Sequence, residues 1–585
     1  MLAATDFPAI WLVDFEFHQP DGERPQPICL VAHEWCQHRT VRCWLYDRPV
    51  PPLPPYPCDR HSLFTAFYAS AELSCHLAMQ WPLPVYVLDL FVEFRCLTNG
   101  RALLCGNSLL GALSAFGLGG LDAGEKEEMR ALAIRGGPYS SEEQQALLEY
   151  CETDVVALAQ LLPVMLPRLD SPRALLRGRY MKAAARIEHA GVPVDTEQLS
   201  IVRQRWPALQ GALIQRIDQR YHVYEGHSFR ADRWEQWVAR RGIPWPRLPT
   251  GRLALDQDTF RDMAHVYPIV NPMRELRATL SQLRLEQLAV GQDGRNRVML
   301  SAFRAKTGRN APSTTKFIFG PAVWIRHLIR PEPGYGVAYV DYEQQEFGIA
   351  AALSGDVAMQ QAYTSADPYL SFAKQANAVP PDATRSTHSA EREQFKACAL
   401  GVQYGMGAES LAYRIGQTPA HARALLRAHR QTYARFWQWV ESAVDYAMLT
   451  RKLHTVFGWT LHVEGNVNPR TLSNYPMQGN ASEMLRLACS LATERGIEVC
   501  APVHDAVLIH APREELPHAI ALTQQCMQQA SEAVLAGYRL RTEAKCFMYP
   551  EHYQDVRGTE MWQTVQGLLM PGYHQTVELA SALAS

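Results

Sequence analysis

The 585-residue chain lacks the features of secreted, membrane-spanning and zinc- or disulfide-stabilised proteins. Its first residues, Met-Leu-Ala-Ala-Thr-Asp-Phe-Pro, contain no basic segment followed by a cleavable apolar one, and no run of about 18 apolar residues occurs. Its thirteen cysteines form no C-x-x-C pair and no His/Cys cluster at zinc spacing. We therefore expect a cytoplasmic protein with reduced cysteines and no membrane partner.

A large charge of either sign is also missing, since the formal net charge is -2. The two ends of the chain nevertheless differ. Residues 1–170 contain 11 Lys and Arg against 21 Asp and Glu, and the remainder contains 46 against 38. A basic body could attract phosphates while an acidic front holds metal-binding carboxylates, although solvated surface charge explains the split about equally well.

Short apolar runs near the N-terminus predict an α/β core. The whole chain is long enough for about two to four domains. Strands at 10–17, 28–35 and 41–46, a helix near 61–80 and a strand at 85–90 give the order βββαβ, which suggests a ribonuclease-H-like fold. Helices are expected at about 107–117 and 141–166. The segment 166–179, with two prolines and several arginines, predicts a domain junction, beyond which amphipathic helix prevails to about residue 300.

Carboxylates recur at fixed spacing in this front region. Asp14 and Glu16 lie two apart in an apolar strand, so both point to the same face. Two carboxylates aimed together need a cation to offset their repulsion. Tyr150 and Asp154 are four apart and share one face of a helix.

This constellation resembles the DEDDy 3'-5' exonuclease domains that accompany many DNA polymerases. By the resemblance, Asp14, Glu16 and Asp154 would hold two Mg²⁺ ions, or Mn²⁺ in their place, and Tyr150 would orient the attacking water. Glu72 would be the fourth metal ligand. The alternative is a degenerate domain kept for packing.

Glu72 departs from that family's pattern. The family usually has Asp at this place, preceded four residues earlier by Asn, and here Tyr68 stands there. The assignment rests on spacing, because Asp89, 17 residues further on, matches a non-catalytic strand Asp of the family. The longer Glu side chain could still reach a metal.

A further carboxylate pair follows a buried strand in the second half of the chain. The segment Val-Ala-Tyr-Val-Asp-Tyr-Glu-Gln-Gln-Glu at 337–346 carries Asp341 at the strand's end and Glu346 after it. A carboxylate at the mouth of a sheet is where an Mg²⁺-dependent phosphoryl-transfer site would start. Taken alone, this segment fits an acidic strand-to-helix turn better.

The next segment predicts a helix with cations on one face. Arg392, Lys396, Leu400 and Tyr404 recur every four residues. Cations on one helical face can clamp a triphosphate, although a solvated basic face is the simpler interpretation of this helix alone.

The third segment, Pro-Val-His-Asp-Ala-Val-Leu-Ile-His at 502–510, places His504 and Asp505 at a tight turn before an apolar strand. One Asp on each of two strands is the minimum needed to bridge two divalent metals.

Together and in this order, the three segments resemble motifs A, B and C of family A DNA polymerases, whose patterns are D-Y-S-Q-I-E, R-x3-K-x7-Y-G and H-D-E. Thr307-Gly308-Arg309 looks like the family's T-G-R segment. The family's R-x3-N-x3-Q-G segment is matched by Arg470, Asn474 and Gln478-Gly479, and residues 187–195 resemble the opening of its polymerase region.

The resemblance implies a role for each matched residue. Asp341 and Asp505 would hold two Mg²⁺ ions. Arg392 and Lys396 would bind the incoming deoxynucleoside triphosphate, with Lys396 also a candidate proton donor to pyrophosphate. Nucleotide contacts are also implied for Leu400, and Tyr404 and Glu346 would close against the sugar and exclude a ribose 2'-hydroxyl. Primer-template contacts are implied for Arg309, Arg470, Asn474, Gln478 and His504.

Two departures from the family patterns bear on activity. Ala506 replaces an acidic residue that is not the principal metal ligand, so activity should survive with an altered metal dependence. Leu400 stands where Phe or Tyr usually packs near the nucleotide sugar, so the enzyme is expected to discriminate against dideoxynucleotides.

The sequence thus predicts an α/β plus α+β multidomain protein, with a ribonuclease-H-like exonuclease domain at 1–170 and a right-hand polymerase domain at 171–585. Within the latter we expect a thumb at about 195–300, fingers at about 351–454, and a palm at about 301–350 and 455–585.

The expected activity is template-directed DNA synthesis with proofreading and without a 5' nuclease, by a monomer in a bacterial cell or a phage-infected host. Processivity or helicase partners are compatible with this function. A 3'-5' exonuclease with a decayed polymerase half, and a non-catalytic DNA-binding scaffold, are the alternatives.

Overall fold

A five-stranded sheet organises the N-terminal region of the computed structural model, which describes residues 7–119, 123–248, 250–281, 285–320, 322–403, 405–465 and 467–569. The strand order is β3-β2-β1-β4-β5. The β1–β2 and β2–β3 pairs are antiparallel, and β4 runs parallel to both β1 and β5. The strands are β1 (Ala9–His18), β2 (Gln26–Glu34), β3 (Arg39–Trp44), β4 (Ser62–Ala66) and β5 (Tyr86–Asp89).

The prediction of a helix near 61–80 was partly wrong, because the first residues of this segment form β4. All five residues of β4 are buried, and it lies between β1 and β5 in the sheet. A short, fully buried run carries no periodicity that separates a strand from a helix. The helix α1 (Ala69–Ala78) begins only after it. The observed order is therefore four strands, a helix and a strand.

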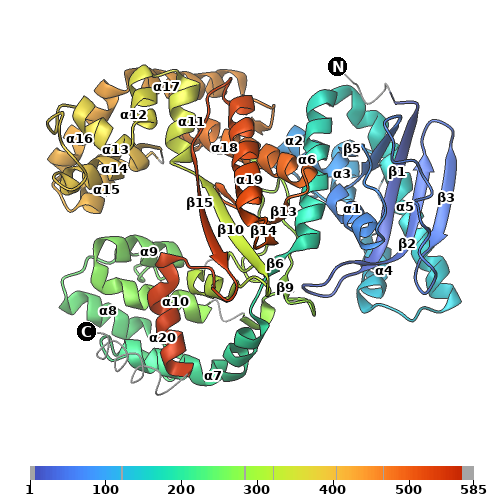
Figure 1. Ribbon diagram of the computed structural model, residues 1–585, viewed down its shortest axis with the longest axis horizontal. Helices are drawn as coiled ribbons and strands as arrows, with labels where there is room; N and C mark the ends of the chain where they lie inside the picture. The colour runs from blue at the N-terminus through green and yellow to red at the C-terminus, as the bar shows by residue number, and fades with distance from the viewer. Residues whose placement is uncertain are drawn as a thin grey trace.

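Helices surround this sheet and connect it to the rest of the chain (Figure 1). The remaining helices of the region are α2 (Leu90–Thr98), α3 (Leu109–Ala115), α4 (Ala123–Arg135) and α5 (Ser141–Met165). The expected junction at 166–179 falls on a 3-10 turn and the first half of α6 (Ser171–Ala190). Because α6 contacts α1 and β5 on one side and α18 and β13 on the other, it joins the N-terminal region to the central sheet.

The central sheet is antiparallel, with the order β13-β14-β10-β15. Its strands are β13 (Glu498–Val503), β14 (Ala506–Pro512), β10 (Tyr335–Tyr342) and β15 (Thr542–Met548). The helices α18 (Pro469–Glu494) and α19 (Leu516–Val534) pack together beside it, and Tyr342 donates a 2.6 Å hydrogen bond to the Met527 carbonyl of α19. Since side chains alternate along a strand, Tyr339 and Asp341 point to the other face.

Two groups of helices flank the central sheet in Figure 1. The upper group comprises α11 (Gln345–Ser354), α12 (Val357–Thr364), α13 (Pro368–Gln375), α14 (Ser389–Gln403), α15 (Ala408–Ile415), α16 (Pro419–Thr432) and α17 (Ala434–Thr450). The lower group comprises α7 (Thr196–Asp218), α8 (Ala231–Arg240), α9 (Gln257–Val266) and α10 (Asn271–Ser281), joined by the late helix α20 (Thr559–Leu569), which packs on α7.

The two groups meet where α15 approaches α9. There the Tyr413 hydroxyl lies 3.7 Å from the Met263 sulfur, and the rings of Tyr413 and Tyr267 are 6.1 Å apart. Short hairpins complete the fold, notably β11 (Lys452–His454) with β12 (Thr460–His462). None of the described helices is both long enough and apolar enough to cross a membrane.

Candidate active sites

The predicted front carboxylates converge between β1, α1 and α5. Glu72, on α1, is 4% exposed, and burial together with the charges of Asp14, Glu16 and Asp154 holds the pKa of its carboxyl well above the usual range. Burial, followed by the same three carboxylates with Asp154 foremost, also raises the pKa of Tyr150. Five side chains from three elements are therefore close enough to act on one another.

Asp89 positions α1 and hence Glu72. Its carboxylate accepts hydrogen bonds from the backbone amides of Ala69 at 2.7 Å and Tyr68 at 3.2 Å, at the start of α1. It also caps α2 by accepting from the Val92 amide at 3.1 Å. One carboxylate thus fixes two helix N-termini and sets where Glu72 enters the cluster.

The donor chemistry of this cluster suits a divalent cation. Among the residues that the structure describes, no group of three or more His, Cys, Asp or Glu side chains is arranged so that it could hold a metal ion. The chemistry fits all the same, because Glu72 Oε2 is buried without a hydrogen-bond partner and the surrounding charges are carboxylates. Hard cations such as Mg²⁺ bind carboxylate oxygens and offset the repulsion between them.

A second acidic site lies on the central sheet, where β10 meets the turn between β13 and β14. Burial, Glu543 and Asp505 raise the pKa of Asp341 to about 7. Burial likewise raises the pKa of Asp505, against the opposing effects of His504, Arg309 and other cations. The two carboxylates predicted from separate motifs therefore lie close enough for their charges to act on one another, and His504 and Arg309 lie near Asp505.

The turn geometry explains how these groups are presented. His504 has a φ of 57°, so the chain reverses tightly there, and the Tyr342 amide donates to the Asp505 carbonyl at 3.3 Å. Gly308, with a φ of 76°, turns the chain just before Arg309, and the preceding Thr307 carbonyl accepts a 2.6 Å hydrogen bond from Ser482 of α18. Glycine adopts the positive φ at position 308 without strain, whereas His504 adopts a similar φ despite its Cβ.

The predicted triphosphate-binding residues lie on α14. Arg392 is buried and donates through Nε to Asp367 Oδ2 at 2.7 Å, with its guanidinium 5.5 Å from the centre of the Tyr369 ring. Asp367 is itself fixed, because its other oxygen caps α13 by accepting from two backbone amides at 3.1 Å. Lys396 is more exposed and lies 3.8 Å from a Glu393 oxygen.

The remaining predicted nucleotide contacts are less completely defined. Leu400 is half-buried on α14, and Tyr404 lies outside the described residues. Glu346 is in the first turn of α11. Burial raises the pKa of Tyr369 to about 12, with Arg392 opposing and Glu346 contributing, so Tyr369 lies near both Glu346 and Arg392.

Arg470, Asn474 and Gln478 lie four residues apart near the beginning of α18, and so occupy one side of that helix. Arg470 also lies beside the end of α14, since a Cβ at Gly405 would come within 2.9 Å of its Cγ. This contact brings the predicted DNA-binding helix to the predicted nucleotide-binding one.

The sequence prediction missed three residues near these sites. Asp89 was noted only as a strand residue, and its two caps depend on the packing of α1 against β5. Asp367 gave no signal because its partner Arg392 is 25 residues away. Glu543 lies in no motif and adjoins Asp341 only through strand pairing.

Comparison with known proteins shows the family of this chain and the likeness of its fold. The sequence model of DNA polymerase family A matches residues 251–546, which is half of the chain. The protein therefore belongs to DNA polymerase family A.

Its curated relatives are distant. It is 24% identical to the thermostable DNA polymerase I of Thermus thermophilus over 383 residues, covering 60% of this chain and 45% of the relative. It is 23% identical to DNA polymerase I of Aquifex aeolicus over 439 residues, covering 68% and 75%. The chain spans about half the length of the first of these relatives.

A solved structure extends the likeness of fold to nearly the whole chain. The POL domain of Pol1 from M. smegmatis, in complex with DNA primer-template and dNTP, has a TM-score of 0.69 and 19% identity, and the match covers 92% of this chain and 94% of that one.

Proposed function

We propose that this protein is a template-directed DNA polymerase that adds deoxynucleotides to a primer 3' end and also carries a 3'-5' proofreading exonuclease. The observation that carries the proposal is the meeting of Asp341 and Asp505 on the central sheet, flanked by Arg309 and His504. Family membership and the likeness of fold support it. Its proposed partners are primer-template DNA and deoxynucleoside triphosphates.

The proposed domains are the predicted ones, with an exonuclease at 1–170 and a thumb, palm and fingers after it. The helical groups at either side of the central sheet support this division (Figure 1). The packing of α20 on α7 favours moving that late helix from the palm to the thumb.

At the polymerase site, Asp341 and Asp505 would hold two Mg²⁺ ions, and at the exonuclease site Asp14, Glu16, Glu72 and Asp154 would do so. Bound divalent ions supply activation of the attacking oxygen and neutralise charge on the leaving group. Tyr150 would orient the attacking water in the exonuclease.

The nucleotide would be bound mainly by α14. Arg392, oriented by Asp367, would hold the triphosphate through its remaining N–H groups, and Lys396 would bind it and donate a proton to the leaving pyrophosphate. Glu346 and Tyr404 would close on the sugar. The duplex would be gripped through its phosphates, and near the primer terminus by Arg309, Arg470, Asn474, Gln478 and His504.

Primer extension and 3'-end digestion by three proteins test this proposal. Asp341→Ala should abolish extension and keep digestion, and Asp14→Ala should do the reverse. A wild-type protein that digests but extends no primer with Mg²⁺ or Mn²⁺ would be an exonuclease with a decayed polymerase half. If it did neither while binding DNA, it would be a scaffold.

A narrower expectation concerns Leu400. Without an aromatic hydroxyl at this position, the enzyme should discriminate against dideoxynucleotides, and Leu400→Tyr should reduce that discrimination. Efficient dideoxy termination by the wild type would contradict this expectation.

A further inference from the structure

Arg309 lies in a loop, residues 300–311, whose two ends are tied together. The Ala311 amide donates a 3.1 Å hydrogen bond to the Leu300 carbonyl, and the Ala305 amide donates to the Arg309 carbonyl at 3.1 Å. The structure describes this loop in full, and it contains no helix or strand. Within the described residues, the buried Nε of Arg309 has no hydrogen-bond partner, so this nitrogen does not place the side chain. Contacts made to the loop backbone from outside therefore determine where Arg309 lies.

The loop backbone is strained at two positions. Ser301 and Phe303 have φ values of 50° and 59°, in the left-handed region that residues other than glycine rarely adopt. Such conformations persist only where the surrounding structure fixes them. The loop thus needs partners outside itself.

The N-terminal region supplies two of these partners at the C-terminal end of α2. Asn99, which follows α2 and is 1% exposed, donates through Nδ2 to the Lys306 carbonyl of the loop at 2.8 Å. The same nitrogen donates to the Thr460 carbonyl of β12 at 2.8 Å. One turn earlier, Arg95 donates to the Arg304 carbonyl at 2.7 Å. Asn99 therefore joins the N-terminal region both to the loop and to the hairpin beside it.

Residues beyond α6 contact the same stretch of backbone. The Lys306 carbonyl accepts a second hydrogen bond, at 3.0 Å, from the indole nitrogen of Trp459. The next carbonyl, of Thr307, accepts from Ser482 at 2.6 Å. Since a carbonyl oxygen has two lone pairs, Asn99 and Trp459 together complete the hydrogen bonding of Lys306. The backbone is thus fixed from both regions three residues before the proposed DNA contact.

We propose that Asn99 is a positioning residue of the polymerase site, which fixes the loop 300–311 so that Arg309 meets the primer-template. Arg95 supports the same loop through its bond to Arg304. The inference rests on the proposed polymerase function. It gives the N-terminal region a part in DNA synthesis that does not depend on exonuclease activity.

Steady-state primer extension tests this inference, with Asp14→Ala in every sample so that digestion does not consume the primer. Asn99→Ala should raise the KM for primer-template about fivefold, as for the loss of one hydrogen bond, with little change in kcat. Arg95→Met should act in the same direction, and an unchanged KM in both variants would overturn the inference. Circular dichroism confirms that each variant is folded, and Arg95→Met decides the question if Asn99→Ala does not fold.

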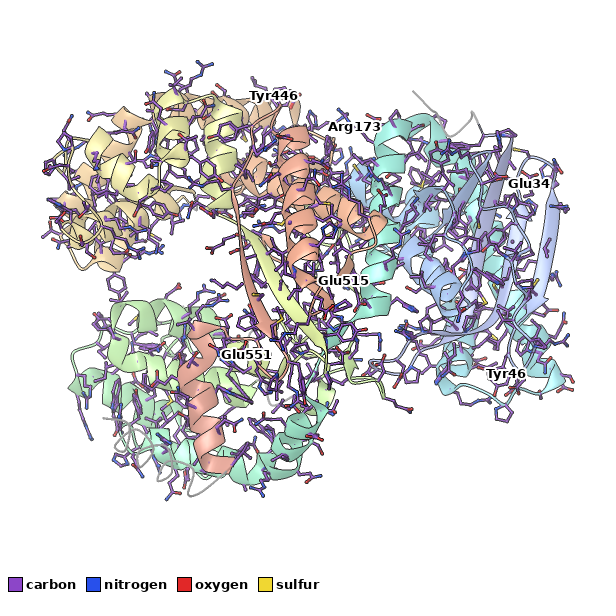
Figure 2. The ribbon with its side chains drawn as sticks, in the orientation of Figure 1. Glu34, Tyr46, Arg173, Tyr446, Glu515 and Glu551 are labelled. Atoms are coloured by element: carbon purple, nitrogen blue, oxygen red, sulfur yellow. The ribbon has the colours of Figure 1, made fainter. Side chains whose placement is uncertain are left out.

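Two control variants alter the N-terminal region outside these contacts with the loop. The Arg101 guanidinium lies 3.2 Å from His462 of β12, so Arg101→Gln disturbs the contact with the hairpin. Tyr46→Phe changes a side chain on the side of the N-terminal region away from the central sheet (Figure 2). Both should leave the KM for primer-template unchanged. A rise in either that equals the rise in Asn99→Ala would mean that any disturbance of this region has the effect, and the specific role of Asn99 would be wrong.

A double-mutant cycle with Arg309→Ala shows whether Asn99 acts through Arg309. If it does, Asn99→Ala adds little once Arg309 is replaced, and the double variant has the KM of Arg309→Ala. If the two increases in KM multiply instead, Asn99 acts independently of Arg309 and the inference is wrong.

Affinity for primer-template separates this inference from the function on which it rests. It is measured by fluorescence anisotropy and needs no DNA synthesis. A wild type that extends no primer would overturn the proposed function, and the same cycle in affinity would still decide whether Asn99 positions Arg309. Equal affinity and equal KM in wild type and Asn99→Ala would overturn the role of Asn99 even in an active polymerase.

Discussion

The carboxylates of the two acidic sites of this protein are surrounded by different charges. Around Glu72, which is 4% exposed, the strongest neighbouring charges are three further carboxylates. Around Asp505 the neighbouring charges include His504, Arg309 and Arg557, all of which favour its ionised form.

The difference indicates what each site depends on. The N-terminal cluster repels itself, so its metal-free form stores unfavourable energy that a cation would remove. At the central site Glu543 and Asp505 also raise the pKa of Asp341, but cations of the protein itself oppose the shift at Asp505. Neutralising one carboxylate should therefore relieve the first site more than the second, where protein cations already offset part of the repulsion.

The largest effect is expected at Glu72. If Glu72 binds metal as proposed, Glu72→Gln should abolish 3'-end digestion while leaving primer extension intact. Without metal, the same variant should be more stable than wild type at high pH. Digestion assays and thermal unfolding in a chelator measure both effects.

The sign of that pH dependence follows from the raised pKa of Glu72. A raised folded-state pKa gives stability below the unfolded value near 4.5, and this stability is lost as pH rises through the folded value. Glu72→Gln should flatten this slope, whereas Glu128→Gln, on the exposed part of α4, should keep it. Equal slopes in wild type and Glu72→Gln would show that the cluster carries no repulsion.

The largest loss of stability is expected from the buried ion pair between α6 and α2, where the N-terminal region is attached to the rest of the chain. Arg177 of α6 makes two 2.6 Å hydrogen bonds to Glu93 of α2, and their side chains are 7% and 2% exposed. Removing one partner of a buried ion pair costs about 3–5 kcal/mol. Arg177→Met should lower the free energy of unfolding by this amount in denaturant titrations.

The double variant Arg177→Met/Glu93→Leu is the matched control. It leaves no unpaired buried charge and should recover most of the loss. If Arg177→Met lowers the free energy of unfolding by less than about 1 kcal/mol, water reaches the ion pair and the contact between α6 and α2 is less tightly packed than its burial indicates.

The sequence predicted which side chains of each candidate site lie together where those side chains belong to short segments with regular spacing. Asp14 with Glu16, and Tyr150 with Asp154, share a face through the periodicity of a strand and a helix. Asp341 and Asp505 could be paired only through resemblance to a family, since 164 positions separate them.

What the sequence did not predict depends on tertiary packing. All five residues of the strand β4, Ser-Leu-Phe-Thr-Ala, are buried, so its pattern does not differ from that of a buried helix. Glu543 adjoins Asp341 only because β15 pairs with β10 in one register, and a slip of one residue would point it to the opposite face.

A smaller effect on activity is expected from the ion pair between Asp367 and Arg392, which orients a predicted triphosphate-binding residue. Asp367→Asn keeps the cap of α13 but weakens the charge-assisted bond that orients Arg392. The KM for deoxynucleoside triphosphates should rise roughly tenfold, which corresponds to about 1.4 kcal/mol, with a smaller change in kcat. Steady-state extension kinetics measure this, with the exposed Asp382→Asn as the control. An unchanged KM would mean that Arg392 needs no such support.

The smallest effect tests whether ion pairs also stabilise the central sheet away from its acidic site. His510 of β14 lies 2.6 Å from Glu332 and 3.0 Å from Glu498, stacks on Tyr335, and faces Arg295, which pairs with both carboxylates.

Burial lowers the pKa of His510, but the two carboxylates outweigh it and the net pKa is raised. The stability it contributes is therefore present below its unfolded pKa and is lost as pH rises through the folded value. We expect the wild type to lose about 1 kcal/mol more than His510→Gln in this range, as for one ordinary hydrogen bond. Because Glu332 has a pKa of about 2, its own contribution disappears only in strong acid. Asp341, whose pKa is about 7, titrates in both proteins, so the difference between their denaturant titrations across neutral pH reports the histidine. Identical curves for both proteins would confine the ion-pair dependence to the acidic site itself.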